Sequence, residues 1–412
     1  MHKYNVILPY PMPRQSGIQK KEGKREIEPS RVKEKVDKGE DVYILDVRTP
    51  EEYESWRISY DKHQNPPLIP IDKFFNSPSE VAKQIPKDKE IVTVCAHGNR
   101  SAMAASLLSQ MGYNVKSMAG GMAGWNTVYD IAPVPLAKDS PVRIWQVRRV
   151  SKGCVGYVIA PSSSSSRDAT VIDPTCDIDQ SFMKVARDND LAISKVIDTH
   201  LHADHVSGLA KLAKEVGALP YVSSLEGYQF DENSKIANPR YVPDGDIIEV
   251  ADGVFLAAIH TPGHTEGSMS FALKMGNGKT HLFTGDTIFV DGIGRPDLRD
   301  RAEEFANNLY HTYHEKILKL PDDTVILSAH VSSSITLKHG EPVYDTLGSI
   351  KKNVELLSMS RDEFVKFVLD TVPPKPANYR KIIDINRGMV PCDRIEMGDL
   401  EAGPNSCAIP AR

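Results

Sequence analysis

Short apolar segments alternate with helical segments along the first third of the chain, and this pattern restricts the fold most strongly. Residues 42–47 and 91–94 read as buried strands. A helix is expected after each, from Pro50, which suits a first helical turn, and over residues 100–111, which are rich in Ala and Leu. Strands that alternate with helices in this way predict a parallel α/β sheet.

A second pattern begins after a proline-containing segment at 126–141, which we interpret as a linker. A chain of 412 residues suggests two or three domains at roughly 150 residues each. We therefore expect an N-terminal arm, a first α/β domain, a second domain and a C-terminal extension packed on that second domain, over residues 1–24, 25–135, 136–341 and 342–412. Further strands are predicted at 142–150, 154–160, 170–172, 195–199, 254–259, 281–284 and 324–327, and tail helices at 349–357 and 361–372.

Composition excludes several classes of protein. The formal net charge of -5 gives no basic excess for nucleic acid or an anionic membrane surface. The longest apolar run, 254–259, is far shorter than the roughly 20 residues of a membrane span, and the N-terminus lacks a signal-peptide pattern. Five cysteines argue against a disulfide scaffold, so a reducing cytoplasm is the expected compartment.

Cys95 lies between a predicted strand and a predicted helix. In such a loop, backbone N–H groups and the positive end of the helix dipole can hold a sulfur anion, and Arg100 adds a fixed positive charge. These surroundings lower a thiol pKa and favour a reactive thiolate, although a buried inert cysteine is the simplest alternative. We expect Cys95 and Arg100 to be catalytic, and the sulfur-cradling loop to comprise Ala96, His97, Gly98, Asn99 and Ser101. Cys154, Cys176, Cys392 and Cys407 lack such a cradle, and we expect them to be structural or incidental.

The segment THLHADH at 199–205 contains four side chains that can bind a metal within six residues. Residues two apart in an extended segment face the same way, so His200 and His202 can converge on one ion. Asp204 and His205 lie at the turn into the next helix and can face the same cavity. His264, Asp286 and His330 each follow a predicted strand, so strand ends deliver them to one rim. The set predicts an open metal site in a cleft.

The N-terminal region resembles the rhodanese (sulfurtransferase) family over about 25–135. The resemblance rests on DVRTPEEY at 46–53, the Cys95 loop, and GGMAGW at 120–125. It implies that Cys95 carries sulfane sulfur as a persulfide, since four residues separate Cys95 from Arg100, the loop length associated with sulfur. The family usually has Gly-His-Ile after the acidic helix, where this chain has Trp56-Arg57-Ile58.

The second region resembles the metallo-β-lactamase superfamily over about 140–340, which implies an αββα sandwich. In dinuclear members, one ion would be held by His200, His202 and His264, and the other by Asp204, His205 and His330, with Asp286 as the bridge. All seven positions are present, so ligand count leaves two zinc ions open.

GRPD at 294–297 and the tail segments SRDEFV at 360–365 and NRG at 386–388 resemble persulfide dioxygenases fused to rhodanese domains. This resemblance implies one Fe(II) per chain, bound by His200, His264 and Asp286, a facial triad that leaves positions for a persulfide sulfur and O₂. His202, Asp204, His205 and His330 would then orient ligands or a water. Arg295 and Asp297 are expected at the substrate, with the guanidinium on a carboxylate of the carrier thiol.

The sequence therefore predicts a bifunctional enzyme that oxidises a small thiol persulfide, with glutathione the expected carrier, to sulfite and exchanges sulfur through Cys95 with thiosulfate or sulfite. The carrier thiol and the direction of the sulfur transfer stay open, and a homo-oligomer is possible. One alternative is a dinuclear zinc hydrolase of glutathione thioesters, of the glyoxalase II type, with an accessory rhodanese domain. The other is a non-enzymatic sulfur carrier.

Overall fold

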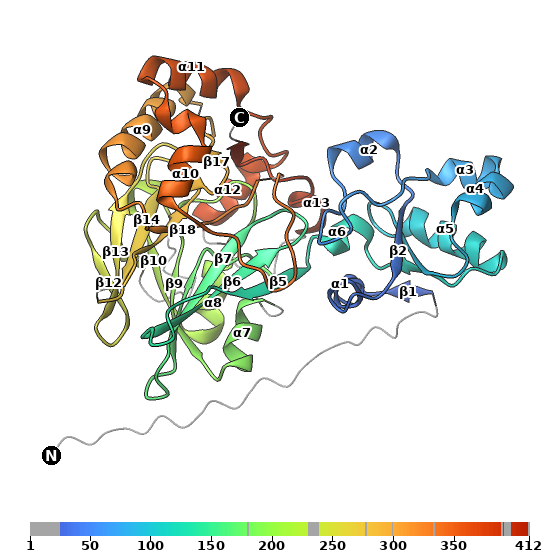
Figure 1. Ribbon diagram of the computed structural model, residues 1–412, viewed down its shortest axis with the longest axis horizontal. Coiled ribbons are helices and arrows are strands. Elements are labelled where there is room, and N and C mark those ends of the chain that lie inside the picture. The colour runs from blue at the N-terminus through green and yellow to red at the C-terminus, as the bar shows by residue number, and fades with distance from the viewer. Residues whose placement is uncertain are drawn as a thin grey trace.

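The computed structural model shows two lobes joined along one side (Figure 1). It describes residues 25–178, 181–229, 239–276, 278–298, 300–332, 334–388, 390 and 397–410. The expected arm at 1–24 lies outside these residues. The smaller lobe is the N-terminal domain, and the larger lobe contains the second domain together with the C-terminal extension.

The N-terminal domain is built on a parallel sheet of four strands in the order β1-β4-β3-β2. This is the predicted architecture, since helices connect the parallel strands. The strands are β1 (Glu26–Ile27), β2 (Val42–Asp46), β3 (Glu90–Val94) and β4 (Val115–Met118). The helices are α1 (Pro29–Asp37), α2 (Pro50–Ser55), α3 (Ile71–Asn76), α4 (Pro78–Gln84), α5 (Asn99–Gln110) and α6 (Gly121–Trp125).

The second domain is a sandwich of two mixed sheets with helices outside each, as the αββα expectation requires. The first sheet runs in the order β11 to β5, comprising β5 (Tyr129–Pro133), β6 (Val142–Arg149), β7 (Val155–Pro161), β8 (Asp168–Ile172), β9 (Ala192–Ile197), β10 (Leu219–Val222) and β11 (Arg240–Tyr241). The second comprises β12 (Ile247–Ala251), β13 (Val254–His260), β14 (Met269–Lys274), β15 (His281–Gly285), β18 (Val325–Ser328) and β19 (Asp345–Thr346).

Amphipathic helices bury the outer faces of these sheets. Leu209 and Leu212 of α8 (Leu209–Val216) are fully buried with Val185 of α7 (Phe182–Asp188) in the core beneath the first sheet. The core under the second sheet takes apolar side chains from α9 (Ala302–Glu315), α10 (Leu347–Asn353) and α11 (Arg361–Thr371).

The expected linker at 126–141 contains a strand of the second domain. Tyr129–Pro133 forms β5, which pairs antiparallel with β6 at the edge of the first sheet. The prolines suggested a linker, and this interpretation was wrong. An edge strand can end in proline, because the missing N–H there removes no hydrogen bond between strands. The expected boundary at 135 thus falls beyond a strand that belongs to the larger lobe.

The C-terminal extension returns to the middle of the molecule. After α11 it forms α12 (Tyr379–Arg387) and α13 (Met397–Leu400), and it ends in β20 (Ala408–Pro410). β20 pairs antiparallel with β17 (Gly292–Gly294), which also pairs with β16 (Ile288–Phe289). Cys407, just before β20, is therefore fixed in place and only 1% exposed.

The two lobes share one continuous apolar core, which includes Trp125 of the smaller lobe and Ile144 of the larger. A buried charge cluster lies beside it. Asp130 of β5 accepts from Lys33 of α1 at 2.6 Å and from His339 at 2.7 Å, and it pairs with Arg148 of β6. These contacts join residues from both lobes at one interface.

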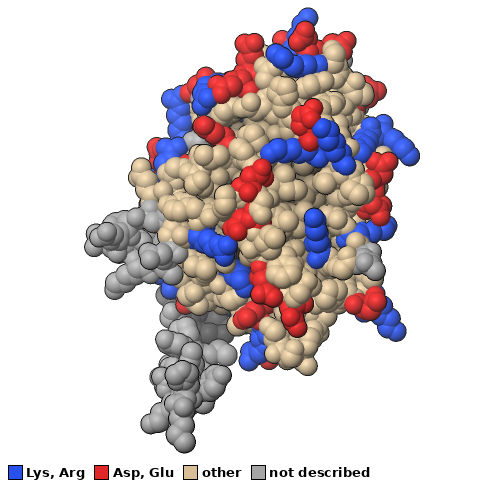
Figure 2. All heavy atoms as spheres, turned by 90° about the vertical axis from the view of Figure 1, so that its left-hand side faces the viewer, with Lys and Arg blue, Asp and Glu red and all other residues tan. Residues whose placement is uncertain are grey.

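The face of the larger lobe in Figure 2 carries acidic and basic side chains interspersed, so that this face offers no single-sign stripe. Among the residues that the structure describes, no helix is both long and apolar enough to cross a membrane.

Candidate active site: a buried metal centre and a sulfur-binding loop

His200, His264 and Asp286 converge on one point in the larger lobe. His200 follows β9, His264 lies in the loop after β13, and Asp286 follows β15 directly. Oδ2 of Asp286 lies 3.7 Å from Nε2 of His200 and 3.5 Å from Nε2 of His264. All three side chains are at most 1% exposed.

Hydrogen bonds fix which atom of each side chain faces this point. Thr199 Oγ1 donates to Asp173 Oδ2 at 2.9 Å, so it accepts from Nδ1 of His200, also at 2.9 Å. Nδ1 of His264 donates to the backbone carbonyl of Arg295 at 2.8 Å. Both imidazoles therefore turn an Nε2 lone pair inward, the orientation that a neighbouring acceptor imposes on metal-binding histidines.

The atoms that face inward have no hydrogen-bond partner within the described structure. These are His200 Nε2, His264 Nε2 and Asp286 Oδ2, which are buried acceptors. Three buried lone pairs that face one another are unfavourable unless a cation lies between them. Adjacent ligands about 2.1 Å from an ion lie about 3.0–3.5 Å apart, close to the observed separations. The donor set therefore fits one metal ion, and two imidazoles with one carboxylate is the set typical of non-haem Fe(II).

His330 connects two carboxylates instead of offering a free nitrogen. Its Nδ1 lies 2.6 Å from Asp286 Oδ1, and its Nε2 lies 3.0 Å from Asp204 Oδ2. Burial alone would lower the pKa of His330, but the two carboxylates raise it well above its ordinary value. With both ring nitrogens bound to carboxylates, His330 offers no free nitrogen to a second metal ion.

His202 and His205, which were also expected to bind metal, lie in other groups of side chains than His200, His264 and Asp286. His202 groups with Asp173 and Asp198, and its Nε2 is 3.2 Å from Asp173 Oδ1. Nδ1 of His205 donates to Asp204 Oδ1 at 2.9 Å, while its Nε2 has no partner in the described structure. Cys154, which sequence reasoning set aside, joins Asp204, His205 and His330 in one buried group.

Arg295 differs from its expected role at the substrate. It is fully buried, and its guanidinium forms a bidentate pair with Asp297 at 2.6 and 2.9 Å. Its remaining donors go to the carbonyls of Pro373, Pro374 and Ser406. All five N–H groups are thereby used. The pair fastens the tail beside the metal centre and leaves no donor for a carrier carboxylate.

Sequence reasoning missed two tail residues that fasten the metal-binding loop. Asn386 of α12 donates to the carbonyls of His202 and His205 and accepts from the Ser207 N–H, each at 2.9 Å. Glu401 accepts from the Val206 N–H. The NRG motif at 386–388 was the available signal, but nothing in the sequence says which loop it contacts.

Cys95 lies at the end of β3, in the loop that was expected to cradle sulfur. Its Sγ accepts from the Gly98 N–H at 3.1 Å and from Ser101 Oγ at 3.4 Å. Gly98 has φ +97°, a conformation that favours glycine, and thereby turns its N–H toward the sulfur. Two hydrogen-bond donors of the loop thus point at the sulfur atom, as the expected sulfur-cradling loop requires.

The GGMAGW segment at 120–125 holds this loop through backbone hydrogen bonds. The N–H groups of Met122 and Ala123 donate to the carbonyls of Cys95 and Ala96 at 2.7 and 3.0 Å. A Cβ on Gly121 would lie 2.2 Å from the Cys95 carbonyl oxygen, so glycine alone permits this approach.

Arg100 lies in the first turn of α5, where its guanidinium binds Glu52 of α2 through two hydrogen bonds of 2.7 and 2.6 Å. The hydrogen bond from Arg100 lowers the pKa of Glu52 to about 2. Glu52 is a further residue of this site, because its carboxylate fixes the position of the Arg100 guanidinium. His97 and Asn99 are exposed at the mouth of the loop.

Comparisons with known proteins agree with this two-domain arrangement. The rhodanese-like domain model matches residues 28–127, and the metallo-beta-lactamase superfamily model matches residues 153–330. The chain is 32% identical to the mitochondrial persulfide dioxygenase ETHE1 of Bos taurus over 227 residues, which are 55% of this chain and 80% of that protein.

Two solved structures are similar to the larger lobe. A metallo-beta-lactamase from Staphylococcus aureus aligns with a TM-score of 0.54 and 29% identity over 62% of this chain and 74% of the other. ETHE1 from Myxococcus xanthus aligns with a TM-score of 0.50 and 26% identity over 59% and 96%. The chain therefore belongs to the persulfide dioxygenase family of the metallo-β-lactamase superfamily, with a rhodanese-like domain preceding that region.

Proposed function

We propose that this protein oxidises a low-molecular-weight thiol persulfide at an iron centre and exchanges sulfane sulfur through Cys95. The observation that carries the proposal is the convergence of His200 Nε2, His264 Nε2 and Asp286 Oδ2, all buried and without partners within the described structure. The overall reaction is RSSH + O₂ + H₂O → RSH + H₂SO₃, in which O₂ is reduced and the outer sulfur is oxidised. Fe(II) at this site would provide the positions at which O₂ and sulfur meet and would relay electrons from the sulfur to O₂.

The protein contributes orientation and exclusion of water. Thr199 and the Arg295 carbonyl hold the two imidazoles in the required tautomers. His330 donates to Asp286 Oδ1, which leaves Oδ2 of Asp286 for the ion. The ligands are almost completely buried, so the centre is separated from bulk solvent.

At the other centre, Cys95 would accept sulfane sulfur and pass it on. In one direction, a Cys95 persulfide transfers its outer sulfur to sulfite, which gives thiosulfate and the free Cys95 thiolate. In the other, the Cys95 thiolate takes the sulfane sulfur of thiosulfate and releases sulfite. A small thiol then takes this sulfur from the Cys95 persulfide, which restores the Cys95 thiolate and forms the small persulfide that the iron centre would consume. The N–H of Gly98 and the hydroxyl of Ser101 would stabilise the leaving thiolate.

Anaerobic purification followed by elemental analysis and O₂ uptake tests the proposal. We expect one iron per chain and O₂ uptake that depends on an added persulfide such as that of glutathione. Protein that contains two zinc ions and consumes no O₂ with any small persulfide would contradict it.

Two variants test whether the centres act separately. Cys95→Ser should abolish thiosulfate sulfur transfer and retain O₂ uptake with added persulfide. Asp286→Asn should lose the metal and O₂ uptake and retain sulfur transfer. Loss of both activities in either correctly folded variant would contradict the two-site assignment.

A dinuclear zinc thioester hydrolase is the second candidate, because His205 Nε2 is buried without a partner in the described structure, beside Asp204 and Cys154. A second ion there would require His330 to give up its hydrogen bond to Asp204. Metal counting and hydrolysis of a glutathione thioester separate this candidate from the first.

A further inference from the structure

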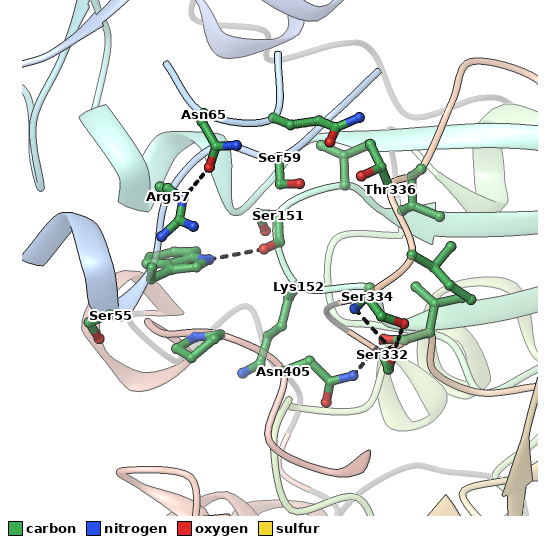
Figure 3. Close-up of a pocket in the computed structure, with 18 of the residues that line it drawn as sticks. Ser55, Arg57, Ser59, Asn65, Ser151, Lys152, Ser332, Ser334, Thr336 and Asn405 are labelled. Atoms are coloured by element: carbon green, nitrogen blue, oxygen red, sulfur yellow. Dashed lines mark hydrogen bonds between the residues drawn. The ribbon is translucent and has the colours of Figure 1, made fainter. Parts of the chain in front are cut away.

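A cavity of about 590 Å³ lies between the two lobes (Figure 3). The N-terminal domain contributes the segment after α2, including Trp56 and Arg57, and the larger lobe contributes the turn between β6 and β7, including Ser151 and Lys152. Trp56 Nε1 donates to the Ser151 carbonyl at 2.9 Å and joins these two walls. Trp56 and Arg57 belong to the tripeptide at which this chain departs from the usual rhodanese sequence.

Two segments of the cavity wall continue directly into the buried group of Cys154, Asp204, His205 and His330. The wall includes Gly153 and Val331, which precede Cys154 and follow His330 directly in the chain. The ammonium group of Lys152 donates to the Asp204 carbonyl at 2.6 Å. Two of the segments that line the cavity thus lead into Cys154 and His330, and a third contact reaches Asp204.

Lys152 is a buried cation that has no ion-pair partner among the described residues. It is 5% exposed, and its ammonium group donates only to backbone carbonyls, those of Asp204 and Glu401. No carboxylate of the described residues lies within salt-bridge distance of it, and the carboxylate of Glu401 is bound to Arg149 and the Val206 N–H. A buried charge without a counter-ion is costly, so a cavity lined by such a group favours an anionic ligand.

A second cation enters the cavity from the other wall. Arg57 donates from Nε to Asn65 Oδ1 at 2.8 Å and pairs loosely with the exposed Glu54 at 3.3 Å. Its Nη2 makes no hydrogen bond to a described residue. Serine and asparagine side chains, including Ser59, Ser332 and Asn405, make up much of the remaining lining. The volume lies within the roughly 300–1,000 Å³ of small-molecule sites.

We propose that this interdomain cavity binds the carrier of the sulfane sulfur, a small peptide-like thiol that bears a carboxylate. Lys152 and Arg57 are the anion-binding groups, and the persulfide end of the carrier points toward the metal-site loops. The inference rests on the proposed function and extends it, because the N-terminal domain then supplies part of the substrate site of the other centre.

Binding without turnover tests the proposal independently of catalysis. Glutathione is titrated calorimetrically into the full-length, metal-loaded protein without O₂, and then into Arg57→Glu and Lys152→Met. We expect each substitution to weaken glutathione binding at least tenfold. Arg31→Glu, on the exposed face of α1, is the matched control and should bind as the unmodified protein does. Equal affinity in all four proteins would overturn the proposal.

Two further measurements separate the alternatives. Metal content and thermal stability should stay unchanged in Arg57→Glu, because Arg57 is partly exposed and distant in sequence from the ligands. Arg57→Lys should recover part of the glutathione affinity.

If sulfite or thiosulfate binding is weakened by the substitutions and glutathione binding is not, the cavity is a site for sulfur oxyanions and the carrier assignment is wrong. Absence of O₂ uptake in the unmodified protein would contradict the proposed function and leave the binding result standing.

Discussion

Nδ1 of His264 donates to the backbone carbonyl of Arg295 at 2.8 Å, while the Arg295 guanidinium holds three carbonyls of the C-terminal extension. One residue thereby orients a candidate metal ligand and fastens the tail beside it. The glycine before it is required at this position, because a Cβ on Gly294 would lie 1.8 Å from the Asp286 carbonyl oxygen.

Replacement of Arg295 by alanine should destabilise the protein. The change leaves the buried carboxylate of Asp297 without its partner and the three tail carbonyls without donors, a loss of about 3–5 kcal/mol. Urea unfolding measures this effect, and Arg295→Ala combined with Asp297→Asn should recover part of it. An Arg295→Ala protein of normal stability with only a raised KM for the persulfide would instead restore the substrate role expected from sequence.

Thr199→Val should weaken metal binding without removing a ligand. The hydroxyl of Thr199 fixes the His200 tautomer, and loss of such an orienting group typically reduces metal affinity by about 10–100-fold. Competition with a chelator measures the affinity. Thr371→Val, at the exposed end of α11, is the control. Unchanged metal retention in Thr199→Val would show that the hydrogen bond has no part in orienting His200.

Asn386→Ala should loosen the metal-binding loop from a distance of more than 180 residues in sequence. It leaves two buried carbonyls and the Ser207 N–H without their partner, at about 1–3 kcal/mol for each unsatisfied group. We expect faster amide exchange around residues 202–207 and easier metal loss. Asn353→Ala, at the exposed end of α10, is the control. Exchange that stays unchanged around this loop would contradict the assignment.

The free energy of unfolding should fall in acid, because the buried carboxylate of Asp130 lies at the interface between the lobes. Burial would raise the pKa of Asp130, but Arg148 and Lys33 lower it to about 2, against an ordinary value of 3.8. A carboxyl with a depressed folded pKa stabilises the protein above its ordinary pKa, and this contribution, about 2 kcal/mol, is lost as pH falls from about 4 toward 2.

Denaturant unfolding at several pH values measures this loss. Asp130→Asn should be less stable near pH 7, since Lys33 and Arg148 lose their charged partner, and should show a smaller further loss between pH 4 and 2. Asp370→Asn, on the exposed side of α11, should follow the unmodified protein. An identical acid dependence in Asp130→Asn and the unmodified protein would remove Asp130 as the cause.

Many elements could be predicted because they depend on local pattern. The strands β2, β3 and β13 follow mainly apolar runs, and α5 and α11 lie within a residue or so of their expected bounds. The strand β5 was missed because an edge position permits the prolines that otherwise indicate a linker.

The sequence by itself determined the residue types and their places at strand ends: a cysteine before a helix, and His200, His264 and Asp286 after separate strands. Ligand type and spacing are local properties, so they can be read from the amino-acid sequence alone. Only the tertiary structure decided that His330 joins two carboxylates, that Arg295 holds the tail, and that Lys152 and Arg57 line one cavity between the lobes. The physical reason is that a hydrogen bond or ion pair depends on which groups packing brings within about 3 Å. Arg149 and Glu401 lie 252 positions apart, and nothing in the sequence marks them as partners.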